Sequence, residues 1–215
     1  MSAPQLDVMV DLETLGNGPR AVILSVGAVF FGDGQLGEEF YTRVDPESCV
    51  RAGLVMDVDT VMWWMGQDSA ARYALIGGDA PALKDVLGDF AWFIGARGLG
   101  GVAERVRVWG NGAAFDNTIL ASAYRATRAP QPWKFWNDRC YRTVKELNRH
   151  LPMTKRTGTH HNALDDAKSQ AGHLMEIFAQ PRSAQFTPPA PAAASTASVW
   201  PRFVEWLQIP PRRVK

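Results

Sequence analysis

The chain has 215 residues, 46% hydrophobic and 21% charged, so it can bury the core of one ordinary domain and is not disordered over most of its length. A net charge of +1 argues against a long nucleic-acid footprint that depends on overall charge. Two cysteines exclude a disulfide framework, and no apolar run is long enough to span a membrane. Residues 1–6 lack the basic and apolar character of a signal region, so we expect a cytoplasmic protein.

The first 45 residues predict three consecutive strands. Residues 8–12 alternate between apolar and other positions, as a half-buried strand does. Residues 21–31 are rich in Val, Ile and Phe and predict a long strand, and residues 40–44 predict a third after the Gly-Asp-Gly turn at 32–34. We expect the three strands to form a meander.

Helical periods dominate the middle of the chain. Asp79 is the expected cap of a helix over residues 83–94, where apolar side chains recur at spacings of three and four. A short strand over 106–109 leads into a helix over 115–127, and the last long helix is expected over 163–178. Strands followed by helices that alternate with a strand predict a mixed α/β sheet flanked by helices.

Proline marks a boundary near residue 180, because seven of the 14 prolines lie beyond it. We expect one domain over residues 1–180, a Pro/Ala/Ser linker over 181–198 and a short, basic, amphipathic helical tail over 199–215. The apolar cluster in that tail could dock on the domain, on a second subunit or on a protein partner. The sequence leaves a homodimer open and does not require one.

Basic residues concentrate in two segments. Residues 134–156 hold seven Lys or Arg against two acidic residues, and residues 181–215 hold five against one, so the remainder is acidic. A solvated charged face and a phosphate-binding face both account for such a pattern.

Three features place acidic side chains at a strand end or a helix start. Asp11 and Glu13 lie two apart at the end of a strand, which puts both on one face, close enough to share a hard cation. Asp116 opens a helix after the Gly-rich turn at 110–112, where an Asp also serves as a simple helix cap. A His precedes an Asp by five residues at the start of the last helix. Each feature alone also fits an exposed loop or helix end.

The His–Asp spacing occurs in two registers. His160 with Asp165 and His161 with Asp166 have the same separation, and the helical period does not separate them because both Asp positions border the apolar face.

Taken together and in this order, the features resemble the DEDDh 3′–5′ exonuclease superfamily, which has a ribonuclease H-like fold. The closest resemblance is to the exonuclease VIII-like and related exoribonuclease family, common in phages and prophages, and it covers about residues 5–180. The segments that carry it are Met9-Val10-Asp11-Leu12-Glu13-Thr14-Leu15-Gly16, Ile23-Leu24-Ser25-Val26-Gly27-Ala28, Asp59-Thr60-Val61-Met62-Trp63-Trp64, Trp109-Gly110-Asn111-Gly112-Ala113-Ala114-Phe115-Asp116-Asn117, Phe135-Trp136-Asn137-Asp138-Arg139 and His161-Asn162-Ala163-Leu164-Asp165-Asp166-Ala167.

The resemblance implies a five-stranded mixed sheet and hydrolysis of single-stranded DNA or RNA from the 3′ end, releasing nucleoside 5′-monophosphates with two Mg²⁺ or Mn²⁺ ions. It implies that Asp11, Glu13 and Asp166 hold the first ion and that Asp11 bridges to the second with help from Asp116. The family pattern selects His161 as the general base. A second hypothesis is a catalytically inactive binding module of the same fold, but all five residues are present.

Substrate contacts are expected from the aromatic side chains and the loop after the first acidic pair. Trp63 and Trp64 follow a helix cap at Asp59 or Thr60, and either one of them stacks on a base while the other packs inward, or both lie in the core. The family places residues equivalent to Thr14 and Leu15 against the terminal nucleotide. The remaining expected contacts are Asn111 and Phe115. The resemblance also favours phosphate binding by the basic segment 134–156.

Overall fold

The computed structural model describes residues 6–67, 69–76, 79–95, 102–153 and 155–181. The strands are β1 (Leu6–Thr14), β2 (Ile23–Gly32), β3 (Gln35–Arg43), β4 (Val106–Gly110) and β5 (Asp138–Cys140). The helices are α1 (Pro46–Arg51), α2 (Val58–Met65), α3 (Ser69–Ile76), α4 (Leu83–Gly95), α5 (Val102–Arg105), α6 (Asp116–Thr127), α7 (Tyr141–Leu147) and α8 (Ala163–Phe178), with a single 3-10 turn, η1 (Phe135–Asn137).

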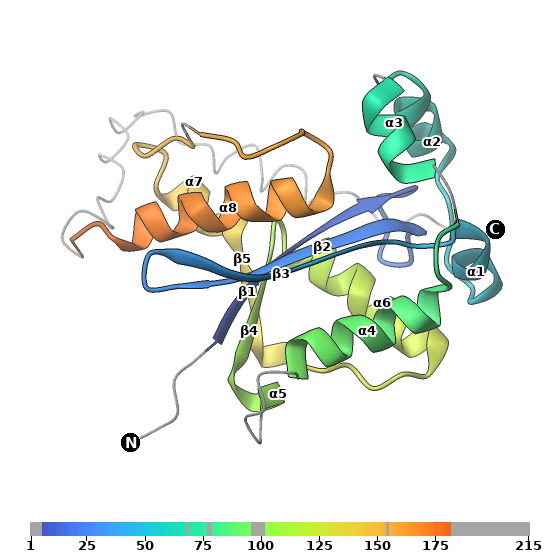
Figure 1. Cartoon of the computed structure of the whole chain (residues 1–215), viewed down its shortest axis with the longest axis horizontal. Coiled ribbons are helices and arrows are strands. Elements are labelled where there is room, and N and C mark those ends of the chain that lie inside the picture. The colour runs from blue at the N-terminus through green and yellow to red at the C-terminus, as the bar shows by residue number, and fades with distance from the viewer. Residues whose placement is uncertain (1–5, 68, 77–78, 96–101, 154, 182–215) are drawn as a thin grey trace, which may run out of the picture. The chain divides into compact units, whose positions relative to one another are not determined.

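The strands form one mixed sheet of order β3-β2-β1-β4-β5, with helices on both faces (Figure 1). β1, β2 and β3 pair antiparallel, and β4 and β5 add to β1 in parallel. This confirms the expected α/β architecture and the meander. Because β1 and β4 run in the same direction, the residues that follow β4 meet the end of β1 at one edge of the sheet.

The third strand begins at Gln35, five residues before the predicted start. Asp33 and Gly34 both adopt positive φ, at 49° and 75°, so a two-residue turn joins β2 to β3. Such turns match the twist of the flanking strands and allow pairing to resume at once. The polar residues after Gly34 are exposed on this edge strand, which is why apolar alternation predicts only its second half.

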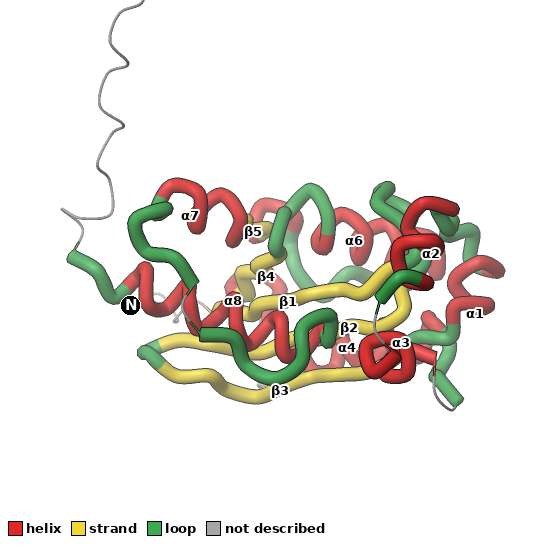
Figure 2. Tube along the Cα trace, turned by 90° about the horizontal axis from the view of Figure 1, so that it is seen from above, coloured by secondary structure: helices red, strands yellow, loops and turns green. Residues whose placement is uncertain are grey.

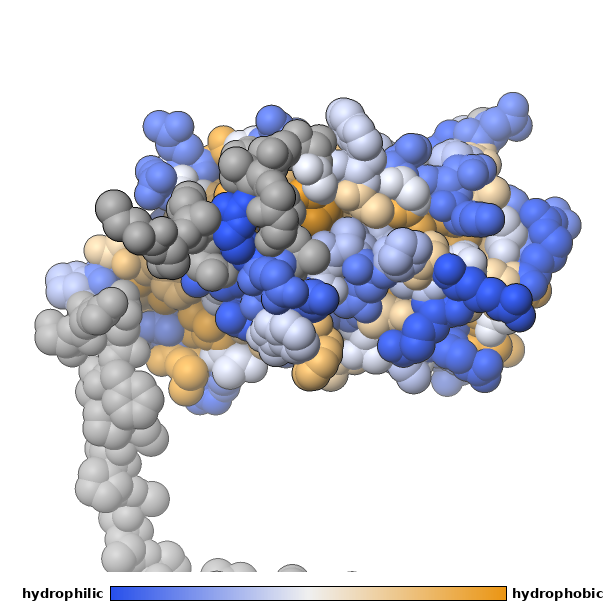
Figure 3. Space-filling model, turned by 90° about the horizontal axis from the view of Figure 1, so that it is seen from below, coloured by the Kyte–Doolittle hydropathy of each residue, from blue (hydrophilic) through white to orange (hydrophobic). Residues whose placement is uncertain are grey.

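Each face of the sheet packs into its own hydrophobic cluster. Val8, Val10 and Leu12 of β1 face α4 and α6, together with residues such as Phe90 and Tyr124. Met9, on the opposite face, packs against α7 and α8. The period of two in β1 therefore places odd-numbered residues on the α8 side. On the other side, hydrophilic side chains cover much of the surface with apolar ones scattered between them (Figure 3).

Helix α8 crosses β1, β2 and β3, with α7 beside it (Figures 1 and 2). The helix begins where it contacts Gly27 of β2, and a Cβ on that residue would lie 2.2 Å from the carbonyl carbon of Ala163 and the nitrogen of Leu164. Only glycine allows the first turn of α8 to approach the sheet backbone so closely. α8 has the predicted bounds, since its long apolar stripe is well defined in the sequence.

Other boundaries differ from the prediction. The residue before α2 is Asp57, so neither Asp59 nor Thr60 is its cap. α4 begins at Leu83, so the expectation that Asp79 caps this helix is wrong. The short elements α1, α3, α7 and β5 span between three and eight residues, too few for periodicity to reveal them.

The predicted linker over 181–198 lies outside the described residues except for residue 181, and the tail over 199–215 lies wholly outside them. In the described part of the chain, no helix combines the length and the apolar character needed to cross a bilayer.

Candidate active site

The strand β1 presents Asp11 and Glu13 on the face that α8 covers. Glu13 is only 7% exposed, and Asp11 is partly buried. Carboxylate oxygens of Asp11, Glu13 and Asp166 all lie within 4.8 Å of one another. The sheet and the last helix thus bring Asp166 to two carboxylates that lie more than 150 residues before it in the sequence.

Asp116 reaches the same end of the sheet from the turn between β4 and α6. It is the first residue of α6 and is 2% exposed. Its Oδ2 atom has no hydrogen-bond partner among the described residues, and it lies 2.9 Å from where a Cβ on Gly110 would be. The capping alternative for Asp116 does not hold, because Phe115 occupies the cap position, without a side-chain hydrogen bond.

The start of α8 separates the two Asp registers. Asn162 caps the helix by accepting from the backbone nitrogens of Leu164 and Asp165, at 3.1 and 3.2 Å. Asp165 turns to the loop, where its Oδ2 accepts from the Thr159 nitrogen at 2.7 Å. Asp166 turns to the carboxylates, and its Oδ1 accepts from Arg156 Nη1 at 2.6 Å. Asp166 is therefore the member of the acidic cluster.

Both histidines lie beside Asp166. His160, His161 and Asp166 each offer a ligand atom within 4.8 Å of the others, and the two rings are 3.8 Å apart at their centroids. His161 is partly buried and packs edge-on against Trp63 and Trp64, whereas His160 is exposed.

The backbone of His161 has a φ of 63°, in the left-handed region that residues other than glycine rarely adopt. Its backbone nitrogen donates to Asp166 Oδ2 at 3.1 Å. This strained turn joins the proposed base directly to a proposed ligand, and strain of this kind often accompanies functional sites.

Crowding and burial favour protonated carboxyls in the cluster without metal. Burial raises the pKa of Asp11 well above its ordinary value, and repulsion from Asp116 and Glu13 adds to this shift. Burial, then repulsion from Asp166 and Asp116, raises the pKa of Glu13 to about 8. Burial raises the pKa of Asp116 to about 7, although backbone hydrogen bonds oppose it. Such shifts mark groups that gain from a nearby cation.

The donor set fits a divalent metal ion. Carboxylate oxygens are the ligands that Mg²⁺ and Mn²⁺ prefer, and three of them converge here. The buried Oδ2 of Asp116 remains available as a further donor, since it has no protein partner among the described residues. Arg156 provides a positive charge at Asp166 in this structure.

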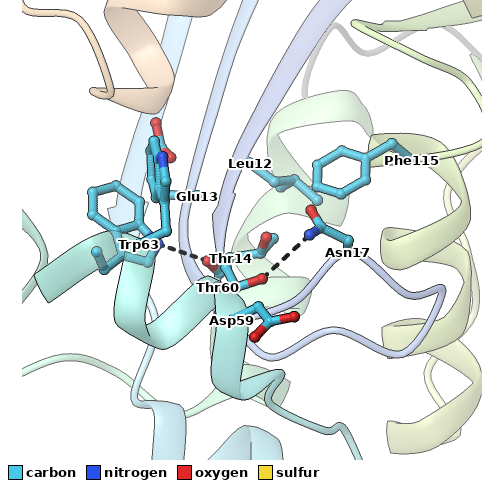
Figure 4. Close-up of a pocket in the computed structure, with 9 residues that line it drawn as sticks. Leu12, Glu13, Thr14, Asn17, Asp59, Thr60, Trp63 and Phe115 are labelled. Atoms are coloured by element: carbon cyan, nitrogen blue, oxygen red, sulfur yellow. Dashed lines mark hydrogen bonds between the residues drawn. The ribbon is translucent and has the colours of Figure 1, made fainter. Parts of the chain in front are cut away.

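An aromatic cavity of about 460 Å³ adjoins the carboxylates at Glu13 (Figure 4). Trp64 is 6% exposed and donates from Nε1 to the carbonyl oxygen of Thr14 at 2.9 Å, which fixes the wall of the cavity. Trp63 is 45% exposed. Of the two alternatives that the sequence leaves open, the structure has one Trp packed inward and the other partly exposed. The lining residues are Leu12, Glu13, Thr14, Asn17, Asp59, Thr60, Trp63, Trp64 and Phe115.

The other expected substrate contacts divide into two groups. Thr14 and Phe115 line the aromatic cavity. Asn111 lines a second cavity, of about 200 Å³, which we call the carboxylate cavity because Asp11, Glu13 and Asp166 also line it. Leu15 does not line either cavity and instead packs against Leu24, Trp64 and Leu75. Its role in the structure is to support the tryptophan wall.

The sequence did not predict that Gln170 and Arg156 would line the carboxylate cavity. Gln170 donates from Nε2 to Asp11 Oδ1 at 2.7 Å, and Arg156 pairs with Asp166. Gln170 lies one helical turn after Asp166, so its i+4 position was a usable signal. Arg156 lies in an irregular loop and had no such signal. Asn17, whose side chain donates to Thr60 at 3.3 Å, was also missed.

Comparison with known proteins agrees with this geometry. The model of the Rv2179c-like 3′-5′ exoribonuclease domain matches residues 6–178. An exodeoxyribonuclease of Enterobacteria phage T4 is 25% identical over 163 residues, with 64% of this chain and 69% of the phage protein covered.

Solved structures share the fold at low sequence identity. The nuclease domain of 3′hExo, a DEDDh family member bound to rAMP, has a TM-score of 0.56 and 16% identity, covering 82% of this chain and 93% of that domain. Exonuclease I of E. coli in complex with a dT13 oligonucleotide has a TM-score of 0.58 and 11% identity, covering 94% of this chain and 43% of the enzyme.

The family match covers residues 6–178, which include all five residues that the sequence predicts for the DEDDh pattern, Asp11, Glu13, Asp116, His161 and Asp166. The chain belongs to the Rv2179c-like 3′-5′ exoribonuclease domain family and is a 3′–5′ exonuclease.

Proposed function

We propose that the protein removes nucleotides from the 3′ end of single-stranded nucleic acid and releases nucleoside 5′-monophosphates with the help of two divalent metal ions. The observation that carries the proposal is that the carboxylate cavity and the aromatic cavity meet at Glu13. A terminal nucleoside in one cavity would place its 5′ phosphate beside the other.

The aromatic cavity suits a nucleoside with a free 3′ hydroxyl. Trp63 offers a ring for stacking, and Asn17 and Thr60 offer polar atoms for the sugar. Among the described residues that line the cavity there is no Lys or Arg, while Asp59 and Glu13 are acidic. A further phosphate on the 3′ side would be repelled there, which favours cleavage at the chain end over cleavage within a strand.

In this proposal Asp11, Glu13 and Asp166 would hold one ion, and Asp11 and Asp116 would hold the other. When bound, such ions activate the attacking water and stabilise the negative charge of the transition state. Gln170 orients Asp11 through its 2.7 Å hydrogen bond. His161, beside Asp166 and the tryptophans, accepts the proton of the attacking water.

The names of the relatives point to both kinds of nucleic acid. The family model is that of an exoribonuclease domain, whereas the phage relative is an exodeoxyribonuclease. We therefore propose single-stranded nucleic acid as the substrate class. The rates of cleavage of matched RNA and DNA strands would show whether the protein prefers one of them. Contacts to the 2′ hydroxyl would produce such a preference.

The proposal is tested with oligomers labelled at the 5′ end and incubated with Mg²⁺ or Mn²⁺. We expect stepwise shortening from the 3′ end, with 5′-monophosphates as products and no reaction after chelation of the metal. A 3′-phosphorylated oligomer should react much more slowly. Tight strand binding without cleavage, with either metal, would instead support the inactive binding module.

The role of His161 has its own test in a matched pair of variants. His161→Ala should lower the cleavage rate about a hundredfold or more while calorimetry still detects divalent binding, because a general base contributes to rate and not to metal ligation. His160→Ala should lower the rate by less than about tenfold. The reverse order of effects would move the base to His160.

A further inference from the structure

A basic groove adjoins the carboxylate cavity but not the aromatic cavity. This groove, with a volume of about 380 Å³, shares Lys145, Met153 and Arg156 with the carboxylate cavity. The aromatic cavity shares Glu13 with the carboxylate cavity and nothing with the groove. The three spaces therefore adjoin in series, with the acidic cluster in the middle. The groove lining is Lys145, Glu146, Arg149, Leu151, Pro152, Met153 and Arg156.

The two ends of this series have opposite chemistry. The groove has three cationic residues against one carboxylate, Glu146, whereas the aromatic cavity has two carboxylates and no cation among its described lining. Leu151, Pro152 and Met153 add apolar surface between the groove cations. Cationic side chains beside apolar surface suit a strand whose phosphates repeat between exposed bases.

We propose that the basic groove binds the part of the strand that lies immediately 5′ of the cleaved bond, and that Arg149 is its principal outer phosphate contact. This inference rests on the proposed function and adds a direction to it: the 3′ nucleoside occupies the aromatic cavity and the remaining strand leaves across the end of α7. A strand that continues on the 5′ side carries a phosphate at every nucleotide, so it requires the cationic end of the series.

The cations of the groove are not equivalent. Arg156 is held by Asp166 at 2.6 Å and belongs to the carboxylate cavity as well. Lys145 also lines both spaces. Arg149 lines only the groove and is paired with the exposed Glu146 at the surface, a contact that contributes little to stability in water. Arg149 is therefore the residue at which groove binding separates best from catalysis.

The basic segment predicted for phosphate binding is accordingly divided. Lys134 pairs with Glu104, Arg139 donates to the carbonyl oxygen of Trp136, and neither residue lines the groove. The second half of the segment, from Lys145 to Arg156, supplies all the cations of the groove.

The experiment compares cleavage of a dinucleotide with that of a dodecanucleotide, each as RNA and as DNA. In Arg149→Glu the ratio of kcat/KM for the long strand to that for the short one should fall roughly tenfold, because only the long strand carries further phosphates on the 5′ side of the cleaved bond for Arg149 to contact. The salt slope of dodecanucleotide affinity, measured by fluorescence anisotropy, should fall by about 0.7 for one lost phosphate contact. Arg149→Lys keeps the charge and should stay within about twofold of the unchanged protein.

The matched control is Arg51→Glu, because Arg51 is likewise an exposed arginine paired with a glutamate one turn away, and it lines neither cavity nor groove. It should leave the ratio and the salt slope unchanged. Equal behaviour of Arg149→Glu and Arg51→Glu in an active protein would overturn the groove assignment. Failure of the unchanged protein to cleave either length would overturn the proposed function itself, which keeps the two outcomes apart.

Discussion

The active site has a sheet half and a helix half, which the fold builds in different ways. Asp11 and Glu13 lie on β1, which pairs with β2 on one side and β4 on the other. His161 lies just before α8, and Asp166 and Gln170 lie in the first half of this helix. The sheet half is held by backbone hydrogen bonds, whereas the helix half depends on side-chain packing and on the contact at Gly27.

This difference teaches where the site is vulnerable. A substitution in the sheet half should remove chemistry and leave the fold, because the buried carboxyls there carry raised pKa values and do not stabilise the metal-free protein. A substitution at the contact between α8 and the sheet should displace several functional groups of the helix half at once. The predictions that follow break or sharpen this contrast.

The largest effect is expected from Asp11→Asn. Loss of the carboxylate that serves both proposed ions should lower cleavage by about a thousandfold or more. The melting temperature without divalent ions should be unchanged or higher, because the substitution removes a carboxyl that burial and repulsion disfavour as an anion. Asp165→Asn, whose Oδ1 can still accept from Thr159, is the control and should keep activity within about tenfold. Wild-type turnover in Asp11→Asn would contradict the ligand assignment.

Gly27→Ala tests the seating of the helix half. The new Cβ would meet the backbone of Ala163 and Leu164 at 2.2 Å, so α8 must move away from the sheet. We expect a loss of about 2 kcal/mol or more in the free energy of unfolding, measured with urea, and a large loss of activity in the folded protein. Gly32→Ala lies on the same strand with nothing within 4 Å of its Cβ and should cost much less. Equal costs would show that α8 does not depend on this contact.

The pH dependence of the free energy of unfolding tests the carboxyls of the sheet half without a substitution that changes packing. Glu13 has a pKa of about 8 in the folded protein against an ordinary 4.5, so between about pH 5 and 8 the unfolded chain releases a proton that the folded chain keeps. Stability without divalent ions should therefore fall as pH rises through this window, by at most about 1.4 kcal/mol per pH unit for this group. Below pH 4.5 both states are protonated and the effect vanishes.

Glu13→Gln is the control for this titration, since it removes the titratable carboxyl group and nearly keeps the shape of the side chain. Thermal unfolding with a chelator at pH 5.5 and 8 should show a weaker fall in this variant than in the unchanged protein. Added Mg²⁺ should stabilise the unchanged protein more at pH 8 than at pH 5.5, because the metal must displace protons from the carboxyls. A fall of equal size in both proteins would contradict the raised pKa of Glu13.

The smallest effect is expected where the two halves meet. Gln170→Ala removes the hydrogen bond to Asp11, and since that bond lowers the pKa of Asp11, the pKa should rise further. Divalent affinity at pH 7, measured by calorimetry, should fall about tenfold and recover in part at higher pH. An affinity deficit that does not change with pH would show that Gln170 acts only through packing.

Several features of this protein follow from local patterns in its sequence. The strand over 8–12 and the helix over 163–178 were predictable, because long stretches of regular apolar period leave few alternatives. The carboxylates Asp11 and Glu13 were predictable as a pair, since a strand places alternate residues on one face. The family resemblance joined Asp116 to this pair and selected His161 and Asp166 from the two His–Asp registers.

The tertiary structure decided what no local pattern contains. Asp165 and Asp166 are equivalent in the helical period, but the close approach of α8 to Gly27 and the capping turn direct only Asp166 to the carboxylates. Leu15, expected at the nucleotide, packs behind Trp64 because the loop after β1 folds against Leu24 and Leu75. Arg156 and the basic groove depend on an irregular loop that brings distant residues together. Such contacts come from chain topology, since residues far apart in sequence can be brought together only by the packing of the whole domain.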